Sequence, residues 1–81
     1  MRHAREDHNR IQDPAGLIPD DEPVFLLRGQ DALAPAVVRE WAFQAEAEGV
    51  DPLMVERARQ HADRMEAWHV DHGKKIPDMP A

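Results

Sequence analysis

The sequence predicts a mainly α-helical protein built on an antiparallel hairpin of two helices, at about residues 35–48 and 52–72. One short N-terminal strand or extended segment, at about 23–28, precedes the hairpin, and self-association is expected to complete the fold. Three observations carry this prediction: a proline opens each expected helix, a glycine follows each, and only three residues separate the two. A link this short forces consecutive helices to run antiparallel.

The segments outside these elements are expected to be polar and irregular parts of a single small domain, 1–81. Residues 1–12 form a polar arm of mixed charge, either a frayed helix or an arm that orders only on contact. Residues 13–22 carry two prolines, one glycine and four acids, which predicts a loop. The tail at 74–81 contains two prolines and is expected to be extended rather than helical.

The short apolar run Val24–Leu27 is expected to belong to the core, and Gly29 and further turn residues stop it abruptly. Four apolar residues fit a buried strand or a helical turn, and the abrupt stop favours the strand. A strand needs backbone partners, and the sequence offers no second strong strand. The partner is therefore expected to be the loop around Leu17 and Ile18 or a second copy, which points to a homo-oligomer. The alternative is a monomer in which this run is a helical turn that covers the hairpin.

The first expected helix begins at Pro35, whose missing N–H costs nothing in a first turn, and ends before Gly49, which suits a left-handed residue. Helical spacing gives this helix one apolar face that is expected to pack against the second helix. The residues of that face are Val37 or Val38, Trp41, Ala42 and Ala45.

The second expected helix has Asp51 as its N-cap, Pro52 in its first turn and Gly73 after its end. Ala58 and Ala62 lie one turn apart, so the partner helix is expected to approach closely there. The apolar face consists of Val55, Ala58, Ala62, Met65 and His69.

Composition excludes several classes of protein. The chain has no cysteine, so neither a disulfide nor a thiolate zinc site is expected. Its net charge of −6 disfavours general nucleic-acid binding, which phosphate neutralisation drives, although one local pocket for a small anion is compatible with it. The longest apolar run is far too short to span a bilayer and no signal peptide opens the chain, so a cytoplasmic protein without a membrane partner is expected. Only two Phe and two Trp are present, and this thin supply of core side chains again favours self-association.

The most promising site is the polar corner formed by Arg28, Gly29, Gln30 and Asp31, between the apolar run and the first helix. The start of a helix offers free N–H groups and partial positive charge, and an adjacent arginine can grip phosphate or carboxylate. A glycine would let a ligand approach the backbone. In the alternative interpretation Asp31 only caps the following turn, and Arg28 pairs with Asp31 or with the acids at 20–22.

Two residues of the first helix complete the predicted ligand-binding set. Trp41 either packs in the core or stacks on a planar ligand such as a base. Arg39 is a solvated surface residue by default, but the symmetry of an oligomer could bring it into a basic pocket. The full predicted set is Arg28, Gly29, Gln30, Asp31, Arg39 and Trp41.

Neither a metal site nor an enzyme is predicted, and no cofactor is expected. His69 and His72 lie three residues apart on a helix, but zinc sites need a third protein ligand and no HExxH motif is present. The adjacent acids Asp20, Asp21 and Glu22 lie in a loop, where carboxylates are usually solvated. There is no Ser/His/Asp spacing and no cysteine nucleophile.

Roughly residues 10–78 resemble a group of small accessory proteins encoded by tailed phages and proteobacterial prophages, for which no activity is settled. The matching elements are an Asp-Glu-Pro-Val-Phe-Leu-Leu-Arg core, Asp21 to Arg28, the Gln30-Asp31 corner, the Arg39-x-Trp41-Ala42 helix and the Pro77-Asp78 tail. The resemblance implies an accessory protein of infection that acts in the host cytoplasm.

By analogy with such accessory proteins, the leading hypothesis is a non-enzymatic counter-defence sponge that sequesters an anionic, nucleotide-like signalling ligand in an oligomeric pocket. One alternative is an acidic protein–protein inhibitor that mimics nucleic acid and blocks a host defence complex. Another alternative is a virion or assembly helper.

Overall fold

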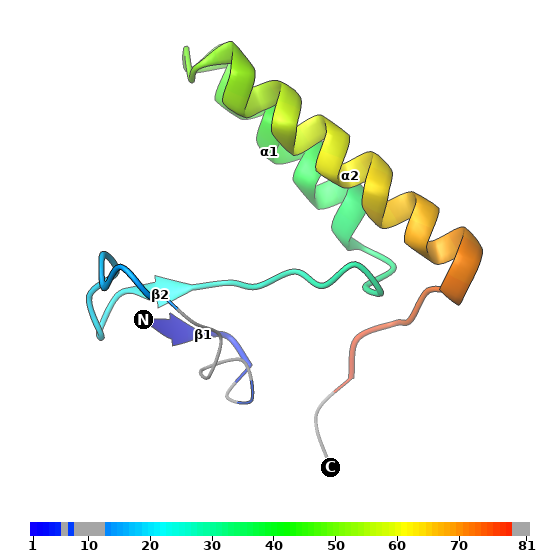
Figure 1. Cartoon of the computed structure of the whole chain (residues 1–81), viewed down its shortest axis with the longest axis horizontal. Coiled ribbons are helices and arrows are strands. Elements are labelled where there is room, and N and C mark those ends of the chain that lie inside the picture. Colours follow the sequence, from blue (N-terminus) through cyan, green and yellow to red (C-terminus); the bar gives the residue numbers. More distant parts are fainter. Residues whose placement is uncertain (6, 8–12, 79–81) are drawn as a thin grey trace. The chain divides into compact units, whose positions relative to one another are not determined.

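A computed structural model describes residues 1–5, 7 and 13–78 of the chain. The elements follow one another as β1, β2, α1 and α2 (Figure 1). They fall into two compact units, one of Met1–Leu27 with Asp78 and one of Arg28–Pro77. The prediction of a single domain stays a prediction.

The first unit contains a parallel pair of two-residue strands, β1 (Arg2–His3) and β2 (Pro23–Val24). Arg2 lies opposite Pro23 and His3 opposite Val24, and the Arg2 amide donates to the Glu22 carbonyl at 2.8 Å. The predicted strand therefore exists but is shorter than expected. Its partner within the chain comes from the polar arm and not from the loop around Leu17 and Ile18. The pairing with a second copy stays a prediction.

The apolar run enters the core only in part. Val24, Leu26 and Leu27 are half-buried, whereas Phe25 is 72% exposed. The expectation that the whole run lies in the core is wrong at Phe25. The four-residue pattern gave no clue to this, because such a pattern does not show which side chains face inward.

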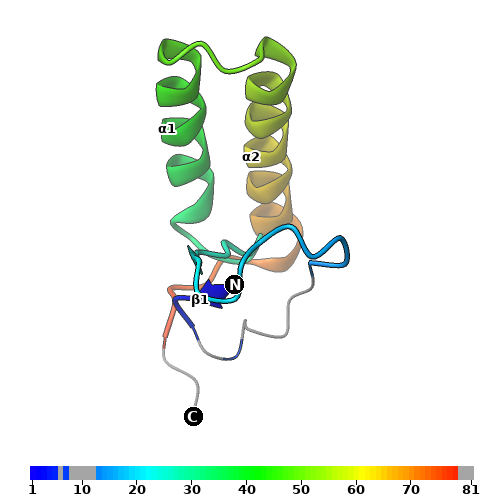
Figure 2. The ribbon, with the colours of Figure 1, turned by 90° about the vertical axis from the view of Figure 1, so that its left-hand side faces the viewer.

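The second unit is the predicted hairpin, α1 (Ala34–Ala47) and α2 (Pro52–His72), whose helices lie side by side (Figure 2). The residues predicted to end α1 and to begin α2 have those roles in the structure. Gly49 has a φ of 79°, the left-handed conformation that lets the chain leave α1. The carboxylate of Asp51 accepts from the Leu53 amide at 2.8 Å and so caps α2.

Small side chains fill the contact between the helices. Ala42, Ala45 and Val55 form its buried cluster, against which Val50 and Ala58 pack. Ala34, Ala62 and Met65 are also buried. These alanines let the two backbones approach closely, as the spacing of Ala58 and Ala62 predicted.

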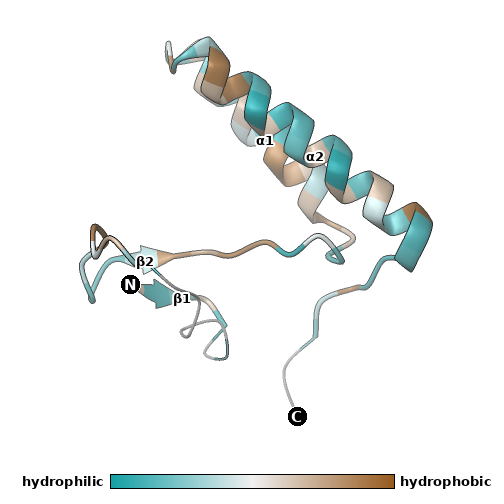
Figure 3. Ribbon diagram, viewed as in Figure 1, coloured by the Kyte–Doolittle hydropathy of each residue, from teal (hydrophilic) through white to brown (hydrophobic). Residues whose placement is uncertain are grey.

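Trp41 does not lie in this core. It is 46% exposed, so its predicted place on the buried face needs correction. Successive helical residues are about 100° apart, so Trp41 sits at the edge of the stripe that its neighbour Ala42 occupies. Apolar and polar residues alternate along both helices (Figure 3).

A backbone bridge closes the open end of the hairpin. The Lys75 amide donates to the Gln30 carbonyl at 2.7 Å, and the Ala32 amide donates to the Lys75 carbonyl at 2.9 Å. The chain that leaves α2 is thus joined to the chain that enters α1. We call Arg28–Leu33 together with Trp68–Lys75 the closed end of the hairpin.

Candidate functional site

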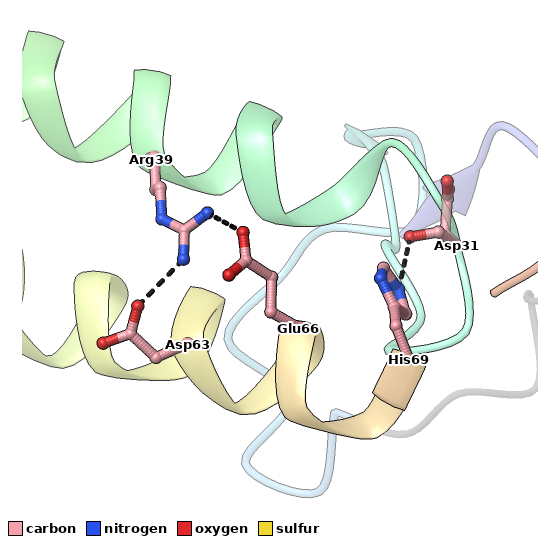
Figure 4. Close-up of polar contacts among 5 residues, drawn as sticks. All are labelled: Asp31, Arg39, Asp63, Glu66 and His69. Atoms are coloured by element: carbon pink, nitrogen blue, oxygen red, sulfur yellow. Dashed lines mark hydrogen bonds and ion pairs between the residues drawn. The ribbon is translucent and has the colours of Figure 1, made fainter. Parts of the chain in front are cut away.

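The polar corner packs directly on the last turns of α2. A β-carbon added to Gly29 would lie 3.8 Å from Cγ of Trp68, so the backbone of Gly29 runs beside the indole. Nε2 of His69 lies 3.1 Å from the Asp31 carbonyl oxygen (Figure 4). A carbonyl can only accept, so Nε2 carries the proton in this contact. Two consecutive residues of α2, Trp68 and His69, therefore hold the corner against the end of the helix.

Two rings extend this site outward. The indole of Trp68 and the imidazole of His72 are stacked, with centroids 3.7 Å apart and planes inclined by 14°. His72 is the last residue of α2 and is exposed, and Trp68 is 47% exposed. The pair presents a flat surface at the closed end on which a planar ligand can stack.

Three positive side chains belong to the same end of the hairpin as the two rings. Arg28 is exposed and makes no ion pair with any residue in the described part of the chain. Lys74 and Lys75 are exposed as well. The closed end carries these three cations and two acids, Asp31 and Asp71, so it is slightly positive in a chain with a net charge of −6. Such a local excess of positive charge can attract an anion.

Asp31 caps the turn that follows it, which is the structural role that the sequence indicated as the alternative to ligand binding. Its carboxylate accepts from the Leu33 amide at 2.7 Å, and its carbonyl accepts from the Ala34 amide at 3.2 Å. Pro35 has no N–H to offer. The start of α1 therefore presents fewer free donors than the sequence suggested, and the attraction for an anion falls mainly to the side chains.

Arg39 is engaged elsewhere. Its guanidinium lies 2.9 Å from the Asp63 carboxylate and also bonds the Glu66 carboxylate, so it joins α1 to α2 (Figure 4). The hydrogen bond that Arg39 donates to Glu66 raises the pKa of Arg39 and lowers the pKa of Glu66. With two carboxylates already bound, Arg39 neutralises internal charge rather than adding a free cation to a site.

Arg39 and Trp41 also point in different directions. Residues two apart on a helix lie on nearly opposite sides, so no single pocket of one chain can use both. The structure keeps Arg28, Gly29, Gln30 and Asp31 together at the closed end and does not gather Arg39 and Trp41 with them.

The sequence interpretation left Trp68, His69, His72 and Lys75 out of the site. A signal for them was available, because an antiparallel hairpin must place the residues after its second helix beside those before its first. That rule brings the end of α2 next to the corner before any side chain is considered.

Neither histidine of α2's last turn is placed for a metal. His69 bonds the Asp31 carbonyl and His72 stacks on Trp68. Among residues 1–5, 7 and 13–78, no three His, Cys, Asp or Glu side chains lie where they could hold a metal ion.

A hollow of about 410 Å³ lies in the first unit around β1 and β2. It is open and mainly apolar. Its lining residues are Arg2, His3, Ala4, Pro23, Val24 and Phe25. This set has one arginine and one histidine but no stacked rings, so it has less to offer a planar anionic ligand than the closed end.

Comparison of the chain with protein families, with curated proteins and with solved structures found no match. No helix within the described residues combines the length and apolar character that a membrane span needs.

Proposed function

We propose that this chain is a non-enzymatic, phage-type counter-defence protein that sequesters an anionic, nucleotide-like ligand. It acts in the host cytoplasm as a homo-oligomer, and the ligand lies at the closed end of the hairpin. The observation that supports the proposal is that Gly29, the residue after Arg28, lies with its backbone against Trp68 of the exposed Trp68–His72 stack, while Arg28 makes no ion pair with the described residues. A nucleotide needs both parts, a flat surface for its base and a cation for its phosphate.

Each residue of the closed end has a distinct role in this proposal. The base extends the stack on the outer face of His72, because stacking tolerates any base and excludes water from the ring faces. Arg28 binds the phosphate through paired N–H donors, a geometry that a guanidinium offers and an ammonium does not. Lys74 adds a long-range attraction that weakens as salt rises. Gly29 and Asp31 hold the corner in place.

The test compares ligand binding by Arg28→Ala with binding by the unaltered chain. Native mass spectrometry with a panel of cyclic and linear nucleotides identifies a ligand and its stoichiometry, and calorimetry then gives its affinity. Loss of a hydrogen bond to a charged group is worth about 1.5–3 kcal/mol, so Arg28→Ala is expected to weaken binding about 10- to 150-fold.

Arg59→Ala is the matched control. Arg59 is an arginine of the same unit, but it pairs with Glu46 away from the closed end, and such an exposed pair contributes little stability. This variant is expected to keep the affinity of the unaltered chain. If Arg28→Ala lowers the melting temperature and leaves the affinity intact, Arg28 is structural and the proposed site is wrong.

One observation supports the alternative of an acidic inhibitor that mimics nucleic acid: Asp20, Asp21 and Glu22 are all exposed in the first unit. It predicts that no nucleotide binds and that reversal of these three charges abolishes inhibition of a host complex. The nucleotide panel therefore separates the two functions directly.

A further inference from the structure

The two long edges of the hairpin, where α1 meets α2, differ in how they are closed. At one edge Arg39 pairs with Asp63 and Glu66, and Glu46 pairs with Arg59. We call this edge the sealed seam, and the edge on the other side of the buried stripe the open seam. Helical spacing assigns the residues of the open seam, because positions three, four and seven apart share a side.

On α1 the open seam carries one row at spacings of four, three and four. Its residues are Val37, Trp41 and Gln44 of α1 and Glu48, which follows the helix as its C-cap. On α2 the open seam carries a longer row at spacings of three and four. Its residues are Met54, Arg57, His61, Arg64, Trp68 and His72. Both tryptophans of the chain thus border the same seam.

The open seam leaves large apolar side chains half in water. The exposed fractions are 49% for Val37, 46% for Trp41, 52% for Met54 and 47% for Trp68. Val37, Trp41 and Trp68 fall at neighbouring levels of the hairpin, and exposed apolar side chains that gather in this way are typical of an interaction surface. The composition of α1 also indicates an interaction surface. Only three of its fourteen residues are charged, and α2 covers only one stripe of it.

The charges that border the open seam lack partners of opposite sign. Within the described residues, Arg57, Arg64 and Glu48 make no ion pair, and Glu40 accepts only from the Gln44 amide. Glu40 lies on α1 and Glu48 directly after it, and the arginines lie on α2. The face therefore has a negative edge and a positive edge on either side of an apolar centre.

We propose that the open seam binds a second copy of this chain, with a two-fold axis parallel to the helices. Such an axis exchanges the two helices, so that α1 of each copy lies over α2 of the other. The negative edge of one copy then meets the positive edge of its partner, twice over. The result is a four-helix arrangement in which both tryptophans of each copy are covered.

The sealed seam fixes which residues meet. Arg39 lies level with residues 63–66, and Glu46 lies level with Arg59. The same register places Glu40 level with Arg64, and Glu48 level with Arg57. An axis parallel to the helices preserves these levels, so Glu48 faces Arg57 of the second copy. Self-complementary charge at matching levels is what singles out a second copy over an unrelated partner.

This inference rests on the self-association included in the proposed function and specifies its surface. The same register brings Val37 of the second copy level with Trp68, at the closed end. The second copy would then cover the side of the indole that faces the open seam and form one wall of the ligand site. The outer face of His72 would stay available to a base.

The test is a charge-reversal cycle in the full chain, measured by sedimentation equilibrium. Glu48→Arg and Arg57→Glu are each expected to weaken dimerisation at least about 10-fold, because every reversal occurs twice in a symmetric dimer. The double variant is expected to recover most of the affinity, since the pair is restored with its sign exchanged. Trp41→Ala is expected to weaken dimerisation more than either reversal.

Glu46→Arg on the sealed seam is the control, and it is expected to leave the dimer intact. If the double variant dimerises no better than the single variants, or if Glu46→Arg weakens the dimer as much as Glu48→Arg, the open seam is not the interface. A chain that stays monomeric at every concentration overturns self-association altogether. Nucleotide binding is measured separately, so the failure of the interface and the failure of the ligand site are distinguishable.

Discussion

Replacing Trp41 by alanine measures how much of this side chain the hairpin covers. A buried tryptophan covers about 150–250 Å² of surface, and Trp41 has just over half of its surface covered. At about 25 cal/mol per Å², the variant is expected to lose about 2–3 kcal/mol of unfolding free energy as a monomer. Complete burial would instead cost about 3–5 kcal/mol.

The assay is urea unfolding followed by circular dichroism, at a protein concentration low enough to keep the chain monomeric. Phe43→Ala is the matched control, because Phe43 is also an aromatic residue of α1 but is 67% exposed. Its expected loss is about 1 kcal/mol. A loss below about 1 kcal/mol for Trp41→Ala, no larger than that of the control, would refute the position of Trp41 at the edge of the core.

Concentration adds a second check on the same variant. If a second copy covers Trp41, the unaltered chain gains stability as its concentration rises, because association favours the folded state. The Trp41→Ala variant is expected to gain less. Equal gains for the two chains would remove Trp41 from the interface while leaving its role in the monomer untouched.

The remaining predictions concern a cap, a pH dependence and a turn. Asp51→Ala removes the acceptor for the Leu53 amide and is expected to cost about 1 kcal/mol, whereas Asp51→Asn retains an acceptor and is expected to cost little, by thermal unfolding. Folding lowers the pKa of Glu66, so the ionised carboxylate stabilises the fold at neutral pH, and this stabilisation is lost as pH falls through the pKa of the folded state. Glu66→Gln is therefore expected to flatten the fall of the melting temperature below about pH 5. Gly49→Ala places a β-carbon at a φ of 79° and is expected to cost about 1–2 kcal/mol, while Gly29→Ala, outside the left-handed region, is expected to be nearly neutral by the same measurement.

The helices were predictable because their ends are marked by residues with strong backbone preferences. Pro52 and Gly73 bound α2 where the sequence placed its ends, and Gly49 marks the end of α1 within one residue. These preferences act through a few dihedral angles and do not depend on distant contacts. The short link between the helices then leaves little choice of topology.

The position of Trp41 was not predictable in the same way. The helix α1 has apolar residues on several sides, so spacing alone does not decide which of Trp41 and Ala42 faces α2. Ala58 of α2 packs against the cluster that Ala42 and Ala45 of α1 form with Val55. Close packing of small residues displaces the largest side chain to the edge.

The partner of the short strand was missed for another reason. Arg2 and His3 have neither the apolar alternation nor the length that marks a strand, and their pairing is a backbone contact. The bridge between Gln30 and Lys75 is likewise made by backbone groups. Backbone contacts of this kind carry no side-chain signature, so the closed end could be inferred only from the topology of the hairpin.

The most direct test of the proposed ligand site is a nucleotide titration of the unaltered chain, followed by amide and indole resonances in NMR spectra. The chain has two tryptophans, so two indole N–H signals report on the closed end and on the middle of α1 separately. The account predicts a saturable shift of the Trp68 indole and the Gly29 amide for at least one nucleotide, larger than any shift at Phe43. Saturable binding that moves the Phe43 region and leaves Trp68 and Gly29 unchanged, or no shift with any member of the panel, would contradict it.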